Sequence, residues 1–136
     1  MQCDILTLFP DMVEAVLSAS ILDRARKKGL LDVCAVNLRD YAEGQHKVAD
    51  DYPYGGGAGM VIKPEPVFRA VENLRARHGD VRLVLMTPQG RTFTQAVAAE
   101  FAAEARRVVF ISGHYEGIDE RVRMGLAPEE IGRAHV

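Results

Sequence analysis

The sequence predicts an α/β fold in which a mostly parallel sheet is flanked by helices. Four short apolar runs, typical of buried strands, occupy residues 2–8, 31–38, 81–86 and 108–112. The segments between them carry apolar residues at helical spacing, except for one long stretch without periodicity. Alternating strands and helices are typical of a parallel sheet, because each helix carries the chain back across one face of the sheet.

The first half of the chain contains two strands and two predicted helices. After the apolar run 2–8, apolar residues recur at helical spacing. A second helix is expected to begin at Ser20, which together with Asp23 resembles a capping box. Cations in its last turn, followed by Gly29, indicate where this helix ends. The second strand is expected at 31–38.

The second half of the chain repeats this alternation. A helix is expected over 64–77, where prolines in the first turn precede an apolar face. The strand at 81–86 follows it, and Thr94 can cap a further helix that runs to about residue 105. The strand at 108–112 completes the predicted sheet.

Length and composition indicate one folded domain. The chain has 136 residues, of which 48% are hydrophobic and 26% charged, with a net charge of −2. These values exclude a disordered chain, and the net charge does not indicate a nucleic-acid-binding domain. No apolar run approaches the roughly 20 residues of a membrane span, and the N-terminus lacks the basic region of a signal peptide. We therefore expect a cytoplasmic protein with no membrane partner.

The cysteines and histidines show no metal-ligand spacing. Cys3 and Cys34 lie in predicted strands, where we expect buried thiols rather than a disulfide. There is no CxxC or HxxH pattern, and the four histidines are scattered. No metal site is therefore expected.

The stretch from residue 39 to 62 has neither helical nor strand periodicity and contains the run GGGAGM at 55–60. It lacks the GK[ST] ending of a phosphate-binding loop, and no strand directly precedes it. Loops of this length in compact domains are commonly functional. We interpret it as a flexible loop that closes over a substrate, with the glycines as hinge.

Two glycine-containing motifs each follow a predicted strand: TPQG at 87–90 and SGHYEGIDER at 112–121. Ligands of open α/β sheets bind beyond the carboxyl ends of the strands, and glycines there allow close approach to the backbone. The glycine in TPQG could equally only turn the chain. The second motif places an aromatic, three acids and an arginine together, which favours a ligand site.

Basic residues occur in pairs and short runs along the chain. Arg24, Arg26, Lys27 and Lys28 lie at one predicted helix end, and Arg106 and Arg107 adjoin the last strand. Such residues usually form solvated surface. If several of them share one side of the molecule, they would instead provide an electrostatic footprint for a nucleic acid.

Four motifs in order resemble one family. LFPDM, DYPYGGGAGM, TPQG and GHYEGIDERV are similar to the motifs of the bacterial tRNA (guanine-N1)-methyltransferases, over residues 1 to about 129. The resemblance implies a knotted, SPOUT-like methyltransferase domain in a homodimer with active sites at the interface. It also implies S-adenosyl-L-methionine as methyl donor and N1 of the guanine 3′ of the tRNA anticodon as acceptor.

The resemblance also implies roles for single residues. Glu116 would reach towards the guanine as an auxiliary acid, and Asp119 to Arg121 would support the cofactor loop. The residues implied to bind the cofactor are Pro88, Gln89, Gly90, Gly113, Tyr115, Gly117 and Ile118. Those implied to bind the target guanine are Tyr54, Gly55, Gly56, Gly57 and Gly59.

The resemblance ends at residue 129. Residues 130–136 read EIGRAHV, which a common sequencing adapter also encodes, and we expect a non-native tail. Residues 1–129 would then be an incomplete methyltransferase domain, truncated before the knot is completed. It would lack the third cofactor loop, the general-base aspartate and the C-terminal tRNA-binding domain, so the fragment is expected to be inactive. Two alternatives are a non-catalytic α/β dimerisation or ligand-binding module and a related knotted methyltransferase for another RNA.

Overall fold

The computed structural model describes residues 1–44, 49–51, 61–113 and 118–132. Its elements, in chain order, are β1 (Gln2–Thr7), α1 (Pro10–Leu17), α2 (Ser20–Lys27), β2 (Asp32–Asn37), the short 3-10 helix η1 (Leu38–Tyr41), β3 (Asp50–Asp51), β4 (Val61–Ile62), α3 (Pro64–His78), β5 (Val81–Thr92), α4 (Gln95–Ala103), β6 (Arg107–Ser112), α5 (Glu120–Leu126) and β7 (Glu129–Gly132). None of the described helices is long and apolar enough to span a membrane.

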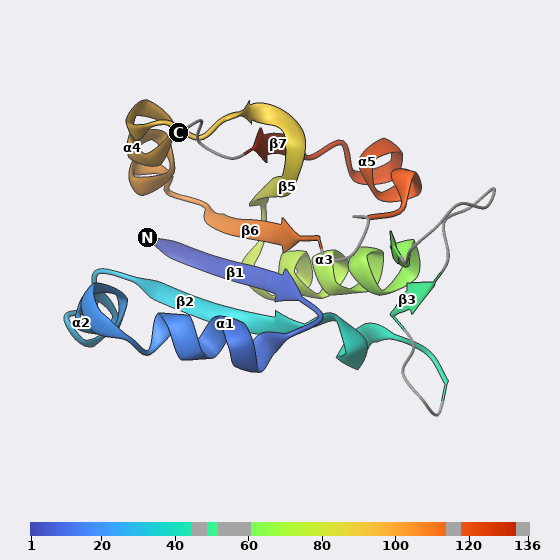
Figure 1. Ribbon diagram of the computed structural model, residues 1–136, viewed down its shortest axis with the longest axis horizontal. Helices are drawn as coiled ribbons and strands as arrows, with labels where there is room; N and C mark the ends of the chain where they lie inside the picture. The colour runs from blue at the N-terminus through green and yellow to red at the C-terminus, as the bar shows by residue number, and fades with distance from the viewer. Residues whose placement is uncertain (45–48, 52–60, 114–117, 133–136) are drawn as a thin grey trace.

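Five strands form one sheet in the order β2-β1-β6-β5-β7 (Figure 1). Every pairing in this sheet is parallel. The first strand of the chain therefore lies inside the sheet, between β2 and the much later β6. The predicted α/β class with a parallel sheet is confirmed.

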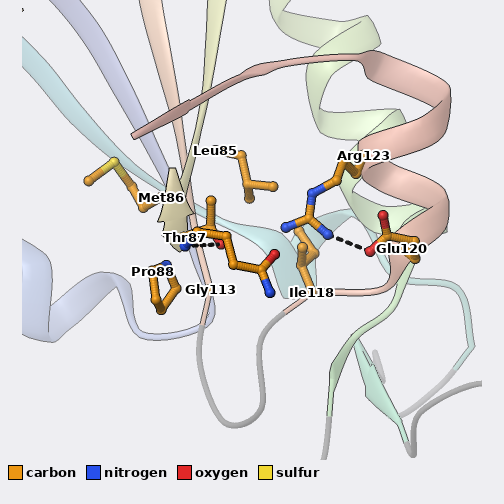
Figure 2. A pocket seen from close by; sticks show the side chains of 9 residues that line it. Leu85, Met86, Thr87, Pro88, Gly113, Ile118, Glu120 and Arg123 are labelled. Carbon is orange, nitrogen blue, oxygen red and sulfur yellow. Dashed lines mark hydrogen bonds and ion pairs between the residues drawn. The ribbon is translucent and has the colours of Figure 1, made fainter. Parts of the chain in front are cut away.

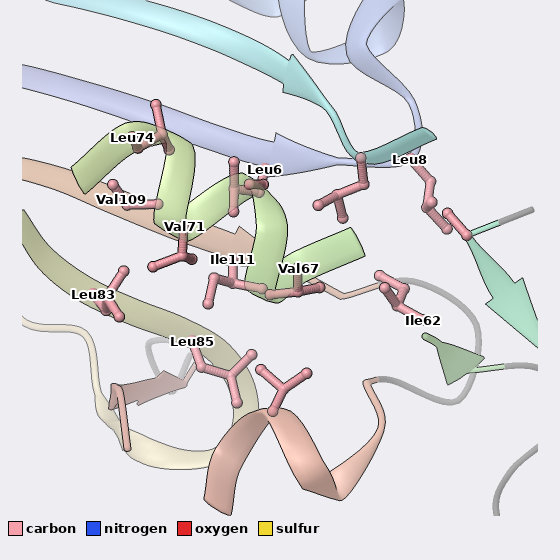
Figure 3. Close-up of a cluster of buried hydrophobic side chains, with 14 of the residues drawn as sticks. Leu6, Leu8, Ile62, Val67, Val71, Leu74, Leu83, Leu85, Val109 and Ile111 are labelled. Atoms are coloured by element: carbon pink, nitrogen blue, oxygen red, sulfur yellow. The ribbon is translucent and has the colours of Figure 1, made fainter. Parts of the chain in front are cut away.

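Helices cover both faces of the sheet, and each face has its own hydrophobic cluster. Figure 3 shows the first, the α3 cluster, in which Val67 and Val71 of α3 lie over strand residues that include Leu83 and Leu85. The second, the α4 cluster, joins Val84 to α4 residues such as Phe101. Neighbouring residues of β5 enter different clusters because successive side chains of a strand point to opposite faces. This explains the continuous apolar runs of the central strands.

β5 is longer than the sequence predicts. The apolar run ends at Met86, but the strand continues to Thr92 and includes TPQG. The prediction that the strand ends before this motif is wrong, because β7 pairs with β5 on both sides of the motif. Ile131 lies opposite both Met86 and Arg91, and the register shifts between these two positions.

β7 joins the sheet through its side chains as well as its backbone. Ile131 is buried in the α4 cluster. Glu129 accepts a hydrogen bond of 2.5 Å from Nε of Arg82, whose guanidinium carbon lies 4.6 Å above the centre of the Phe101 ring. The domain boundary expected at residue 129 thus falls at the first residue of a paired strand, while residues 133–136 lie outside the described part of the chain.

The stretch from 39 to 62 contains more structure than its lack of periodicity predicts. It begins inside η1, and β3 and β4 pair antiparallel, with Asp50 opposite Ile62. These elements are only two to four residues long, too short to produce a recognisable pattern. The GGGAGM run lies between β3 and β4, outside the described residues.

A buried ion pair joins β1 to β6. Asp4 and Arg107 are 2% and 8% exposed. Nε of Arg107 donates to Oδ2 of Asp4 at 2.5 Å, and Nη2 donates to Oδ1 at 3.2 Å. The interpretation of Arg107 as a solvated surface residue is therefore wrong. The sequence does not reveal its burial, because the carboxylate that pairs with it is 103 positions away. Bidentate arginine–carboxylate pairing of this kind is geometrically specific.

The two cysteines differ in exposure. Cys3 is buried in β1, whereas Cys34 is exposed on the edge strand β2, and both are free thiols. The expectation of two buried thiols is wrong for Cys34, because an edge strand has a neighbour on one side only. Burial raises the pKa of the Cys3 thiol to about 11.

This difference predicts selective alkylation. Iodoacetamide at pH 8 is expected to modify Cys34 in the folded protein and to leave Cys3 unmodified, because a buried thiol with a raised pKa forms little thiolate. Peptide mass spectrometry with and without urea measures the effect. Equal modification of both cysteines in the folded protein would contradict the burial of Cys3.

Candidate functional site

A pocket of about 330 Å³ lies at the edge of the sheet where β6 ends and β5 shifts its register (Figure 2). Its walls come from β5, from the residue after β6 and from α5 with the turn before it. The lining residues are Leu85, Met86, Thr87, Pro88, Gln89, Gly113, Ile118, Glu120 and Arg123. This edge is where open α/β sheets bind their ligands.

The pocket gathers residues that the resemblance assigns to the cofactor. Pro88 and Gln89 of β5 line the same pocket as Gly113 and Ile118, although Pro88 and Gly113 are 25 positions apart in the sequence. Gly113 is exposed, so its backbone is accessible from the pocket. Four residues from two motifs thus meet in one cavity, as parallel pairing of β5 and β6 requires.

Gly90 has a different environment. A Cβ on Gly90 would lie 2.5 Å from the backbone carbon of Glu130 and 2.5 Å from the nitrogen of Ile131. Gly132 faces it from β7, where a Cβ would lie 3.0 Å from the Gly90 oxygen. Gly90 is not among the described lining residues of the pocket, and its missing side chain allows β7 to lie against TPQG.

Several predicted site residues fall in segments that the structure does not describe. Among the implied cofactor residues these are Tyr115 and Gly117, and Glu116 lies in the same segment. The implied guanine-binding residues outside the described part are Tyr54, Gly55, Gly56, Gly57 and Gly59.

The described ends of these two segments lie side by side. Ile62, which follows the glycine-rich segment, forms a parallel bridge with Ile118, which follows the segment 114–117. The backbone nitrogen of Asp119 donates to the Ile62 oxygen at 3.1 Å. Since Ile62 is fully buried, this contact joins residues 118 and 119 to the core.

Asp119 fixes the start of α5 below the pocket. Its Oδ1 accepts hydrogen bonds from the backbone nitrogen and from Nε of Arg121, both at 2.9 Å, and its Oδ2 accepts one from Nη2 at 2.9 Å. The Arg121 guanidinium lowers the pKa of the Asp119 carboxyl, so this helix-capping group stays ionised. These contacts fit the supporting role that the resemblance gives to Asp119 to Arg121.

Arg123 lines the pocket although the sequence analysis does not single it out, and Glu120, expected only as part of the support below the cofactor loop, lines it as well. Arg123 donates from Nη1 to Glu120, three residues earlier on α5, and from Nε to Oε1 of Glu130 at 2.6 Å. Hydrogen bonding to Glu130 raises the pKa of Arg123, which keeps it charged. The i, i+3 spacing, which places two helix residues on one face, is the sequence signal that could have identified the pair.

The described side chains are suited to binding rather than to covalent chemistry. No group of three His, Cys, Asp or Glu residues within the described ranges is arranged to hold a metal ion. Glu120, the carboxylate among the described lining residues, is paired with Arg123. The pocket combines apolar walls, an exposed glycine and a few polar groups, which is typical of small-molecule sites.

Comparisons with known proteins identify relatives along nearly the whole chain. The family model described as tRNA (Guanine-1)-methyltransferase TrmD matches residues 1–133. A tRNA (guanine-N(1)-)-methyltransferase of Staphylococcus epidermidis is 55% identical over 131 residues, which are 96% of this chain and 53% of that protein. The Myxococcus xanthus protein of the same name is 53% identical and is covered over 51% of its length. The chain therefore spans about half the length of the curated relatives it matches.

A solved structure has the same fold. The crystal structure of tRNA (m1G37) methyltransferase from Aquifex aeolicus matches 91% of this chain and 56% of that chain, with a TM-score of 0.80 and 33% sequence identity. The predicted SPOUT-like methyltransferase fold is thereby confirmed, and neither alternative function is favoured. Fold, family model and relatives agree, and the chain belongs to the tRNA (guanine-1)-methyltransferase family.

Proposed function

We propose that this chain forms the S-adenosyl-L-methionine-binding half of an enzyme that methylates N1 of the guanine 3′ of the tRNA anticodon. The observation that carries this proposal is the pocket in which Pro88, Gln89, Gly113 and Ile118 meet. The family and its relatives are named for methyl transfer to guanine N1 of tRNA, and this reaction needs a methyl donor.

The residues present fit such a donor. The pocket volume of about 330 Å³ lies in the range of small-molecule sites, roughly 300–1,000 Å³. Leu85, Met86 and Ile118 supply apolar surface suited to a flat base, and Gly113 leaves backbone groups accessible. Glu120 and Arg123 supply charged groups on the side of the pocket away from Met86 and Pro88 (Figure 2). The cofactor would bring an activated methyl group on its sulfonium, so the protein has to bind and orient it.

The acceptor places further demands on the complete enzyme. Guanine N1 carries a proton, which a general base has to remove, and the guanine must leave its stack to be reached. The resemblance implies that Glu116 approaches the guanine. We therefore propose tRNA as the substrate of the complete enzyme and a homodimer in the cytoplasm as its working form.

A calorimetric experiment tests the cofactor site. The 136-residue chain is titrated with S-adenosyl-L-methionine and with S-adenosylhomocysteine. Gly113→Val places a branched side chain in the pocket wall and is expected to weaken binding of both by about tenfold or more, the effect of about 1.4 kcal/mol of lost contact. Ala99→Val, at an exposed position of α4, is the matched control and is expected to bind as the unchanged chain does.

Two results would contradict the proposal. Unchanged affinity of a folded Gly113→Val variant would place the cofactor elsewhere. Binding of neither compound by the folded, unmutated chain would overturn the proposal that residues 1–136 bind the cofactor on their own. Circular dichroism of each variant shows whether it is folded.

A further inference from the structure

Arg123 is positioned to contact a ligand in the pocket. It lies on α5, and Figure 2 shows its guanidinium directed into the pocket, on the side opposite Met86 and Pro88. The side chain is 25% exposed. Glu130 holds Nε from one direction and Glu120 holds Nη1 from another, so the plane of the guanidinium is fixed before any ligand arrives.

The hydrogen bonds to Glu120 and Glu130 leave the Nη2 donors of Arg123 available for a ligand. A guanidinium has five N–H groups, of which two are on Nη2. Within the described part of the chain, Nη2 of Arg123 has no hydrogen-bond partner, whereas Nε and Nη1 each have one. A preorganised arginine with an open terminal nitrogen suits a carboxylate oxygen.

The surrounding charge restricts what kind of anion could bind. The part of the pocket around Arg123 has a formal charge of −1, because one arginine is paired there with two glutamates, Glu120 and Glu130. A phosphate, with its higher negative charge, would be repelled. An amino-acid group carries an ammonium beside its carboxylate, so its carboxylate can meet Nη2 while its ammonium remains near the glutamates.

We propose that Arg123 binds the carboxylate of the amino-acid part of the cofactor and thereby orients the methionine chain in the pocket. The inference rests on the proposed cofactor site and specifies which end of the ligand faces α5. The apolar side formed by Met86 and Pro88 would then receive the base. Arg123 is in this sense a specificity-determining residue that selects ligands with an intact amino-acid group.

The test compares two ligands that differ only at this end. S-adenosylhomocysteine has the amino-acid group, and 5′-deoxy-5′-methylthioadenosine keeps the adenine, ribose and thioether without it. Arg123→Met is expected to weaken binding of S-adenosylhomocysteine by about tenfold, as loss of a charged hydrogen bond does, and to leave methylthioadenosine binding unchanged. Arg123→Lys keeps the charge without the planar fork and is expected to recover part of the lost affinity.

The binding test has a control variant, and each contrary result leads to a different conclusion. Arg75→Met, at an exposed position of α3, is expected to change neither affinity. Equal weakening of both ligands by Arg123→Met would show that Arg123 only shapes the pocket and would overturn the inference. Unchanged S-adenosylhomocysteine affinity would overturn it as well, while the cofactor site itself would stand. Failure of the unmutated chain to bind either ligand would instead refute the proposed site and this inference with it.

Discussion

Arg107→Met is expected to lower the free energy of unfolding by about 3–5 kcal/mol, the usual cost of breaking a buried ion pair by removing one partner. Asp4, which is 2% exposed, would keep its place between strands without a cation to neutralise it. Arg107 also donates from Nη1 to Asp32 at 3.3 Å, so its loss affects three strands of the sheet. A change of this size is a large fraction of the stability of a domain this small.

Urea denaturation followed by circular dichroism measures this effect. Arg77→Met, at an exposed position near the end of α3, is the matched control and is expected to stay within about 0.5 kcal/mol of the unchanged chain. The double variant Asp4→Leu with Arg107→Met is expected to recover much of the stability, because no buried charge is left unpaired. If Arg107→Met cost less than about 1 kcal/mol, the pair would not be buried in solution as it is in the structure.

Gly90→Ala is expected to destabilise the protein by about 2–3 kcal/mol, in the range of overpacked sites. The added Cβ would lie 2.5 Å from backbone atoms of Glu130 and Ile131, and backbone cannot turn aside as a side chain can. β7 would therefore have to move away from β5. We expect the amide hydrogens of β7 to lose their protection from exchange, while those of β1 and β6 keep theirs.

Gly125→Ala provides the comparison for this variant. Its Cβ would lie 2.7 Å from Cζ of Phe68, a ring that can rotate, so a smaller loss of stability is expected. Hydrogen exchange read out by mass spectrometry, together with thermal denaturation, distinguishes the two variants. Full protection of β7 in a Gly90→Ala variant as stable as the unchanged chain would show that β7 does not lie against TPQG.

The fold was predictable where the determinants are local. The apolar runs that became β1, β2 and β6, Gly29 after α2 and the Thr94 cap of α4 act over a few residues. The capping box expected at Ser20 is wrong, because the N-cap of α2 is Ala19 and no side chain caps this end of the helix. Features that depend on distant partners were missed. β5 continues through TPQG only because β7 pairs with it, and Arg107 is buried only because Asp4 lies on the neighbouring strand. Contacts between residues that are far apart in the sequence leave no periodic pattern in either segment.

The candidate site, too, was predictable only where its determinants are local. Pro88, Gln89, Gly113 and Ile118 could be placed together because motifs that end adjacent parallel strands meet at one edge. Gly90 follows them in sequence, but the position of β7 decides its environment. Arg123 was missed because its orientation depends on Glu130, which is seven positions away and on another element.

The interior position of β1 has a consequence for synthesis on the ribosome. The unit from β1 to β2 can pair as soon as about 40 residues have emerged, but the other edge of β1 stays open until β6 has been made. An open apolar edge invites pairing with other chains. During this interval Asp4, in the middle of β1, would lack its Arg107 partner, and a charge within an open strand disfavours pairing with other chains. The same carboxylate that binds Arg107 in the finished sheet would thus disfavour aggregation of the chain before β6 has been made.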